Sequence, residues 1–311
     1  MQEAYPVISN IPTHIMTWGK WIEESFDENE KELVICISGN PGLPGFYTKF
    51  LSVLHSTCNR EIPVWVIGHA GHDEEPESVY KKKVPILAGN EELFNLDAQI
   101  KHKVDFIRKY VKPGVKIHLI GHSIGAWIVL ELLKIEDIRD KVQHCYLLFP
   151  TIERMAESSN GFILTKLVAP IFFILRIFYQ FFSKLPMFLR ICILYAYFFI
   201  MSIPYYFIGT GIKYSKPEVI DRLWFMALDE MIKVKELDVD IIKKNKNILK
   251  FYYGTTDGWV PVKYFHELKE KIPDVDAELC SKKYAHAFVL RSAVPMAHMV
   301  GEWILQNRVQ N

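Results

Sequence analysis

Short apolar runs alternate with amphipathic stretches along much of the chain. Apolar repeats every three or four positions predict helices, and they lie at 96–111, 126–133 and 293–305. Runs rich in Val, Ile, Leu and aromatic residues predict buried strands at 33–37, 62–68, 115–120, 145–149, 248–253 and 279–284. This alternation predicts an α/β fold, with a mostly parallel sheet flanked by helices and right-handed crossovers.

A different pattern interrupts the alternation between residues 162 and 207. Half of the chain's 20 phenylalanines fall there, and no acidic residue occurs between Glu157 and Glu218. The uncharged segment 191–212 is long enough to cross a bilayer as a helix. The turn signal at 183–186 predicts a helical hairpin. Ser215 and Glu218 resemble a capping box that opens the helix leading back to the core.

These patterns divide the chain into three parts. We expect a first core part at 1–150 and a second core part at 239–311. Between them, 151–238 is expected to form a hydrophobic helical insertion. The length fits one α/β domain with such an insertion.

The strongest chemical signal is Gly-His-Ser-Ile-Gly at 121–125. It lies between a predicted strand and a predicted helix, which places Ser123 on a sharp turn with its hydroxyl pushed out of the sheet. Small residues are needed on both sides because such a turn brings its flanks close together. This context predicts a serine nucleophile. The alternative is a glycine-rich turn that only packs.

A serine nucleophile needs a base, and the base needs an orienting carboxylate. In α/β-hydrolases these follow in the chain order Ser, Asp or Glu, His. Asp257 lies in a Gly- and Pro-containing loop after the predicted strand at 248–253, and His286 follows the last predicted strand. We therefore predict Ser123 as the nucleophile, Asp257 as the orienting acid and His286 as the base.

Other histidines and acids are weaker candidates for these roles. His298 falls in a helical pattern and is expected to be partly buried, and His266 is expected on a helix surface. Asp274 and Asp276 lie beside Pro273 and suggest a solvated turn. Asp229 could orient the base only from a strand end, and its surroundings suggest a helix.

An oxyanion hole requires two N–H donors aimed at the developing charge. The residue after the nucleophile, Ile124, is expected to supply one. The loop Ser-Gly-Asn-Pro-Gly at 38–42 follows the strand at 33–37 and is expected to supply the other. Because Pro41 has no N–H, Asn40 is the predicted donor. The alternative is an ordinary strand-to-helix loop.

The predicted triad restricts how the insertion can meet a membrane. Ser123 precedes the insertion, and Asp257 and His286 follow it, so both flanks must lie on the same side. A single crossing is therefore excluded if the triad forms. The remaining arrangements are a re-entrant or interfacial hairpin over about 161–212, or a lid buried against the core. Basic residues without acidic ones suit a phospholipid-coated surface.

The remaining composition narrows the class of protein. A net charge of +1 and the absence of a basic stripe give no reason to expect nucleic-acid binding. Five scattered cysteines without a C-x-x-C pair indicate reduced thiols and a domain that faces the cytosol. His69 and His72 lack accompanying ligands, so no metal site is predicted. We predict no cofactor.

Several motifs together resemble the lipid droplet-associated hydrolase family. The resemblance extends over roughly residues 30–305. The motifs are Gly-Asn-Pro-Gly at 39–42, Gly-His-Ala-Gly-His at 68–72, Gly-His-Ser-Ile-Gly at 121–125, Phe-Pro-Thr-Ile-Glu-Arg-Met at 149–155, Tyr-Tyr-Gly-Thr-Thr-Asp at 252–257 and His-Ala-Phe at 286–288.

The resemblance implies an α/β-hydrolase fold, and it matches Ser123, Asp257 and His286 to the family's triad. It also implies a place at lipid droplets and the endoplasmic reticulum, a role in neutral-lipid storage, and a proposed sterol ester hydrolase activity. A hairpin can enter a droplet monolayer from the cytosolic side with both of its ends outside, whereas a spanning helix has no second aqueous side to reach.

Three functions fit these expectations. The first is a serine hydrolase that acts on lipid esters, with the catalytic domain facing the cytosol. The second is a droplet-surface protein whose hydrolase core is mainly a scaffold. The third is an acyltransferase that uses the same triad with an alcohol acceptor, and the sequence does not separate it from hydrolysis.

Overall fold

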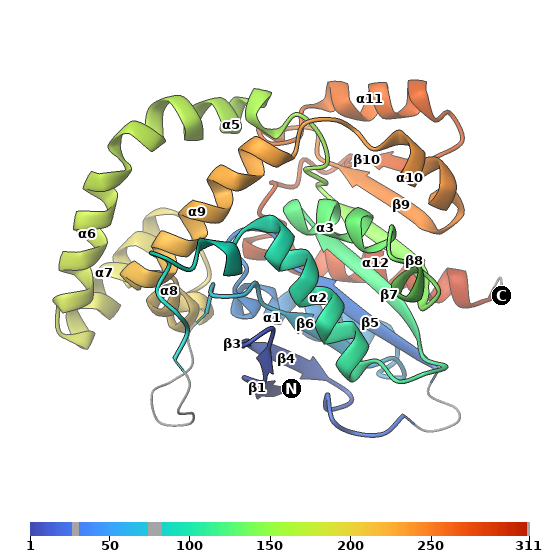
Figure 1. Cartoon of the computed structure of the whole chain (residues 1–311), viewed down its shortest axis with the longest axis horizontal. Helices are drawn as coiled ribbons and strands as arrows, with labels where there is room; N and C mark the ends of the chain where they lie inside the picture. The colour runs from blue at the N-terminus through green and yellow to red at the C-terminus, as the bar shows by residue number, and fades with distance from the viewer. Residues whose placement is uncertain (27–30, 74–82, 310–311) are drawn as a thin grey trace.

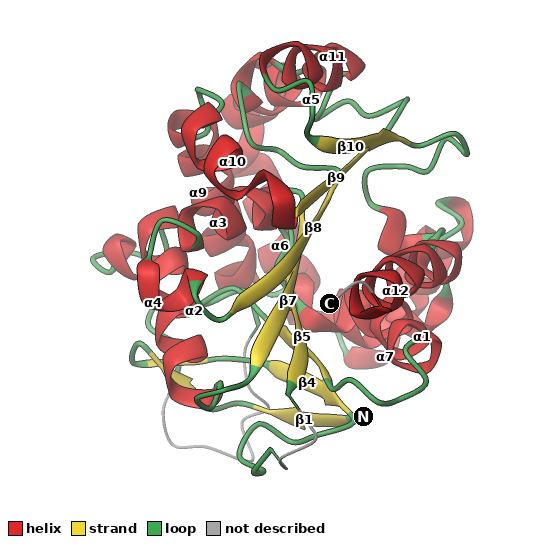
Figure 2. Ribbon diagram, turned by 90° about the vertical axis from the view of Figure 1, so that its right-hand side faces the viewer, coloured by secondary structure: helices red, strands yellow, loops and turns green. Residues whose placement is uncertain are grey.

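The computed structural model describes residues 1–26, 31–73 and 83–309, and a twisted sheet runs through its centre (Figure 2). The strand order is β1-β4-β6-β5-β7-β8-β9-β10. The strands are β1 (Gln2–Ala4), β4 (Ile15–Trp18), β5 (Glu32–Ile37), β6 (Val64–Ile67), β7 (Lys116–His122), β8 (Val142–Leu148), β9 (Leu249–Tyr253) and β10 (Asp276–Leu279). A small separate hairpin joins β2 (Val7–Ile8) and β3 (Ile11–Pro12).

Strand direction follows the predicted pattern. All neighbours from β6 to β10 pair in parallel, and β4 pairs antiparallel with both β1 and β6. Residues 33–37 of β5 are completely buried because the strand lies between β6 and β7 and is covered on both faces. A continuous apolar run is typical of such a strand. The predicted parallel sheet flanked by helices is confirmed.

Helices cover both faces of the sheet (Figures 1 and 2). Helices α1 (Thr48–Thr57) and α12 (Ala293–Val309) pack together on one face, and α2 (Leu96–Tyr110) packs beside α3 (Ile124–Leu132) on the other. The remaining core helices are α4 (Glu136–Arg139), α10 (Val239–Asn245) and α11 (Val262–Lys271). Short 3-10 turns lie at Pro44–Tyr47, Glu91–Leu93, Met155–Glu157, Lys246–Ile248 and Phe288–Leu290.

A group of helices leaves the core after β8 and returns before β9, and it forms one side of the molecule (Figure 1). The helical stretch Ser159–Lys184 is continuous and contains π-helical and 3-10 turns between α5 and α6. The helices of the whole group are α5 (Ser159–Phe162), α6 (Phe172–Lys184), α7 (Met187–Ile200), α8 (Ile208–Tyr214) and α9 (Pro217–Lys233). The break between α6 and α7 lies at the predicted hairpin turn. We call α5 to α8 the apolar helices.

Two local predictions were wrong. The last strand, β10, occupies Asp276–Leu279 and not 279–284, so Asp276 lies in a strand and not in a turn. Lys250 Nζ contacts Asp276 and Glu278 at 3.0 and 2.5 Å, which pairs the charged, outward side of this edge strand. The predicted capping box does not form, because Pro217 is the first residue of α9 and the Ser215 hydroxyl donates to the Ile212 carbonyl instead.

Candidate active site

Ser123 lies on the turn between β7 and α3, with φ of 56° and ψ of −124°. Residues other than glycine rarely adopt this backbone conformation because it is strained. Strained residues of this kind cluster at functional sites. The backbone can form this turn because glycines lie two residues before and two residues after Ser123. A Cβ on Gly121 would lie 2.7 Å from the Ala126 Cα, and one on Gly125 would lie 2.3 Å from the Ile37 carbonyl oxygen. The small residues of the motif are therefore required by backbone contact.

Ser123, His286 and Asp257 form one chain of hydrogen bonds. His286 Nε2 lies 2.8 Å from Ser123 Oγ, and its Nδ1 lies 2.6 Å from Asp257 Oδ2. An ionised carboxylate only accepts hydrogen bonds, so Nδ1 carries the proton and Nε2 accepts from the serine hydroxyl. This is the arrangement in which a histidine can act as a general base towards serine.

The loop after β9 fixes the carboxylate. Asp257 Oδ1 accepts hydrogen bonds from the main-chain N–H groups of Trp259 and Val260, at 2.8 and 3.2 Å. The other oxygen is therefore aimed at His286. The Asp257 side chain is completely buried, which strengthens its interaction with the imidazole.

A second histidine, His122, binds the main chain of His286. His122 Nε2 lies 2.9 Å from the main-chain oxygen of His286, and its Nδ1 lies 2.6 Å from the Tyr47 hydroxyl. Burial and the nearby His286 lower the pKa of His122 to about 3, so its ring is neutral at physiological pH. The ring therefore donates from Nε2 and accepts at Nδ1 from Tyr47.

The predicted oxyanion loop lies against the nucleophile. A Cβ on Gly39 would come within 2.9 Å of the Ser123 Cβ. The Gly39 N–H is already bonded to the Tyr47 hydroxyl at 2.8 Å. Among the described residues, no protein acceptor is paired with the N–H of Asn40 or of Ile124. These two groups remain available to a substrate oxygen.

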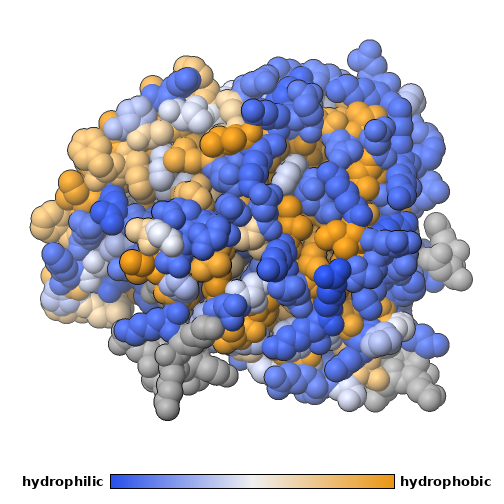
Figure 3. All heavy atoms as spheres, viewed as in Figure 1, coloured by the Kyte–Doolittle hydropathy of each residue, from blue (hydrophilic) through white to orange (hydrophobic). Residues whose placement is uncertain are grey.

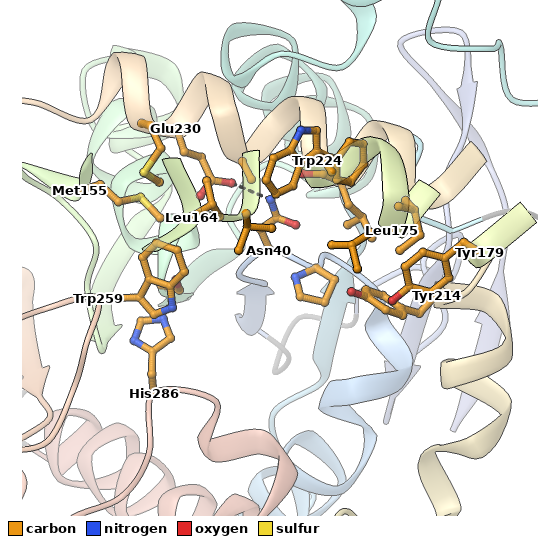
Figure 4. Close-up of a pocket in the computed structure, with 18 residues that line it drawn as sticks. Asn40, Met155, Leu164, Leu175, Tyr179, Tyr214, Trp224, Glu230, Trp259 and His286 are labelled. Atoms are coloured by element: carbon orange, nitrogen blue, oxygen red, sulfur yellow. Dashed lines mark hydrogen bonds between the residues drawn. The ribbon is translucent and has the colours of Figure 1, made fainter. Parts of the chain in front are cut away.

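An apolar cavity of about 310 Å³ extends from Ser123 between the core and the insertion (Figure 4). Trp259 and His286 lie at one end of it, Asn40 lies near the middle, and Tyr179 and Tyr214 lie at the other end. Leu164, Leu175, Leu223 and Met231 are among its apolar lining residues. A cavity of this kind fits a hydrocarbon chain whose polar group lies beside Ser123.

The alternative candidates lie elsewhere. His298 is exposed on α12, not partly buried as expected, and its Nδ1 lies 3.0 Å from the Thr57 hydroxyl. His266 is exposed on α11 and Asp274 is exposed before β10. Asp229 lies on α9, as its surroundings suggested, where it accepts a hydrogen bond from the Leu96 N–H.

Sequence reasoning missed three supporting residues: Tyr47, His122 and Glu230. His122 stands within the motif, but nothing in the pattern indicates that its ring reaches the main chain of His286. Glu230 lies on α9, with its side chain buried at the cavity wall, and its chain position gives no sign of this. Among residues 1–26, 31–73 and 83–309, no group of three or more His, Cys, Asp or Glu residues could hold a metal ion.

The apolar helices expose most of their large hydrophobic side chains, and Figure 3 shows this apolar side next to a mainly hydrophilic core. The helical stretch Ser159–Lys184 has a mean hydropathy of 2.0 over its most apolar window, and 6 % of that window is buried. It is long and apolar enough to cross a membrane by length and composition. The alternative of a lid whose apolar side chains are buried against the core does not match this exposure.

Comparisons with known proteins agree with the fold and identify the family. A family model described as lipid-droplet associated hydrolase matches residues 30–289. A lipid droplet-associated hydrolase of Drosophila melanogaster is 56 % identical over 309 residues, with 99 % of each chain covered. The one of Homo sapiens is 32 % identical over 313 residues, which cover 97 % of this chain and 94 % of that protein.

Solved structures share the architecture at low identity. The thioesterase domain from the curacin biosynthetic pathway matches with a TM-score of 0.62 and 15 % identity over 96 % of this chain and 98 % of that chain. A serine hydrolase from Cycloclasticus zankles matches with a TM-score of 0.59 and 14 % identity over 97 % of each chain. This likeness shows the α/β-hydrolase fold. The family match and the identity to its relatives show that the chain belongs to the lipid droplet-associated hydrolase family.

Proposed function

We propose that this protein is a serine hydrolase that cleaves carboxylic esters of lipids, among them sterol esters, at the surface of lipid droplets. The observation that carries the proposal is the unbroken chain of hydrogen bonds from Ser123 Oγ through His286 to Asp257, at 2.8 and 2.6 Å. The name shared by its relatives supports the lipid droplet as the site of action.

The geometry suggests a two-step reaction. His286 Nε2 takes the Ser123 proton while Oγ attacks the ester carbonyl carbon, and the N–H groups of Asn40 and Ile124 stabilise the resulting oxyanion. The intermediate then expels the alcohol, which leaves with the proton from His286. Water, deprotonated by the same histidine, attacks the acyl-enzyme. The products are the free acid and regenerated Ser123.

The exposed apolar helices support the proposed location. We place them in the phospholipid layer of a droplet or of the endoplasmic reticulum, over about residues 161–212, with both core parts on the cytosolic side. Burying such side chains contributes about 1.5–3 kcal/mol each. The ester would enter the cavity from the lipid past α6, and the reaction would take part in neutral-lipid storage.

A second candidate function is a droplet-surface protein whose core is mainly a scaffold. Helix α7 favours it, because α7 lines no part of the active-site cavity and yet exposes Phe199 and Ile200 by 74 % and 75 %. The apolar surface is therefore larger than a substrate entrance requires.

Labelling with a fluorophosphonate probe tests the hydrolase. The vesicle-bound protein and its Ser123→Ala variant are exposed to the probe, and folding of both is checked by circular dichroism. We expect labelling and ester turnover in the first and neither in the second. Equal turnover by a folded Ser123→Ala variant would refute the proposed mechanism. Absent labelling in the folded, lipid-bound protein would favour the scaffold.

A further inference from the structure

The side chain of Asn40 is held by two residues of α9. Its Nδ2 donates to the Glu230 carboxyl oxygen Oε1 at 2.9 Å (Figure 4). The same nitrogen donates to the Leu223 carbonyl at 3.1 Å. The proposed oxyanion donor, the main-chain N–H of the same residue, has no protein acceptor among the described residues. One residue therefore carries both the anchored group and the group proposed to act on the substrate.

Glu230 is an unusual residue for this place. Its side chain lies at the wall of an apolar cavity and is 2 % exposed. Among the described residues, no Lys or Arg pairs with its carboxyl group. A buried, uncompensated carboxyl group is costly, so it is tolerated only where it makes a needed contact. Among the described residues, the hydrogen-bond partner of this carboxyl group is Asn40.

We propose that Glu230 is a positioning residue for the oxyanion site: its carboxyl group holds the Asn40 side chain and thereby fixes the main-chain N–H of Asn40 beside Ser123. The inference rests on the proposed serine hydrolase function. Misplacing a catalytic donor by a fraction of an ångström weakens its bond to the transition state more than its bond to the ground state. Loss of the anchor should therefore lower kcat and leave KM unchanged.

The contact also links the site to the apolar helices. Phe172 of α6 stacks on Trp224 of α9, with ring centroids 4.2 Å apart, and Arg176 of α6 makes a two-point ion pair with Asp221 of α9. Helix α9 is thus joined to the lipid-facing helix on one side and to Asn40 on the other.

Protonation gives the proposal a specific signature. Burial raises the pKa of Glu230 to about 8, so its carboxyl group is mostly neutral at pH 7. Ionisation would place a negative charge beside the site where the oxyanion forms. The negative charge of Asp229 on α9 also raises this pKa, and the other titratable groups that line the cavity are His286 after β10, Tyr179 on α6 and Tyr214 on α8. A Glu230→Gln variant keeps the acceptor oxygen and cannot ionise.

The test compares four proteins in phosphatidylcholine vesicles with p-nitrophenyl octanoate as substrate: the unmodified protein, Glu230→Gln, Glu230→Leu and Glu218→Leu. Glu218 is exposed on the same helix and serves as the matched control. Rates are expressed per serine labelled by the fluorophosphonate. Deuterium exchange of the peptide that contains residues 38–43 is measured in parallel.

We expect Glu230→Leu to lower kcat about 10- to 100-fold, below the 10²–10³-fold cost of losing a whole donor, with KM unchanged and faster exchange in 38–43. Glu230→Gln should retain kcat at pH 7 and lack the decline of kcat near pH 8 that the unmodified protein shows. Glu218→Leu should match the unmodified protein.

Unchanged kcat in Glu230→Leu, or a loss in Glu230→Gln equal to that in Glu230→Leu, would overturn the proposal. If the unmodified protein shows no turnover that depends on Ser123, the proposed hydrolase function is wrong. Deuterium exchange of residues 38–43 then remains as the test of whether Glu230 holds Asn40. Unchanged exchange of 38–43 in Glu230→Leu would then overturn the anchor as well.

Discussion

The hydroxyl group of Tyr47 joins two segments that meet at Ser123. It accepts from the Gly39 N–H of the oxyanion loop and donates to His122, whose other nitrogen donates to the His286 carbonyl. The loop that carries the proposed oxyanion donor and the loop that carries the base are therefore held by one side chain. Tyr253 offers a contrast, because its buried hydroxyl has no partner among the described residues.

These two tyrosines make a matched pair for measurement. Tyr47→Phe should lower the free energy of unfolding by about 1–3 kcal/mol, because it leaves a buried N–H and a ring nitrogen unpaired. Tyr253→Phe should leave it unchanged or raise it, because it removes an unpaired hydroxyl. Urea unfolding measures both. An equal loss in the two variants would show that the Tyr47 bonds contribute nothing specific.

Single residues also mark how far the sequence predicts the site. Ser123, Asp257 and His286 could be placed by chain order, because each follows a strand that ends at the same edge of the sheet. Glu230 could not be predicted as a site residue, because its role depends on how α9 packs against the core. The helical pattern of the sequence around Glu230 does not determine that packing. The same applies to Tyr47, which precedes a helix and carries no local signal.

At the scale of elements, α6 has two different apolar faces. Phe172, Leu175 and Tyr179 line the active-site cavity, whereas Phe173 and Phe181 are 61 % and 67 % exposed on the other side. Spacings of three and four residues keep the cavity-lining set on one face of the helix, and the spacing of eight residues, about two turns, keeps Phe173 and Phe181 on another. The sequence predicted the apolar hairpin and its turn, but the uniform hydrophobicity concealed which face was which.

Charges on the outer face of α6 should separate lipid binding from folding. We expect the double variant Phe173→Asp, Phe181→Asp to keep its unfolding midpoint and to lose flotation with phospholipid-coated oil droplets, because each exposed Phe contributes about 1.5–3 kcal/mol when buried in lipid. Ile232→Asp, at an exposed apolar position on α9, is the control and should still float. Flotation of the double variant at the control level would contradict the proposed lipid contact of α6.

Edge elements were the least predictable. Strand β10 lies at the end of the sheet and alternates charged and partly buried residues, so no continuous apolar run marks it. The stretch after it, residues 280–285, forms turns that lead to His286. The central strands were placed to within a few residues, because burial on both faces requires the continuous apolar run that the sequence shows.

At the scale of the whole molecule, several histidines are buried in neutral form. Burial, followed by neighbouring positive charge, lowers the pKa of His69, His72 and His102 well below 6.5, and burial lowers that of His122 to about 3. Their contribution to stability is complete above pH 6.5 and is lost as the pH falls towards their folded values. His14 opposes them: its burial is outweighed by hydrogen bonds to Asp73 and Glu3, and its pKa is raised.

The protein should therefore be less stable in urea at pH 5.5 than at pH 7.5. Each buried neutral histidine adds up to about 1.4 kcal/mol per pH unit to the slope. His102→Gln should reduce that slope, and His266→Gln, at an exposed position, should leave it unchanged. Equal slopes in the two variants would show that His102 takes no part in the acid sensitivity.

The thickness of a single helix separates the active-site cavity from the exposed apolar surface, because α6 forms a wall of both. In the proposed reaction, the ester therefore reaches Ser123 by diffusing in two dimensions within the layer that holds the enzyme. The rate is then governed by the mole fraction of ester in that layer, and the amount of lipid per unit volume of suspension has no direct effect. Phospholipid that dilutes the ester at the surface slows the enzyme without touching its catalytic residues.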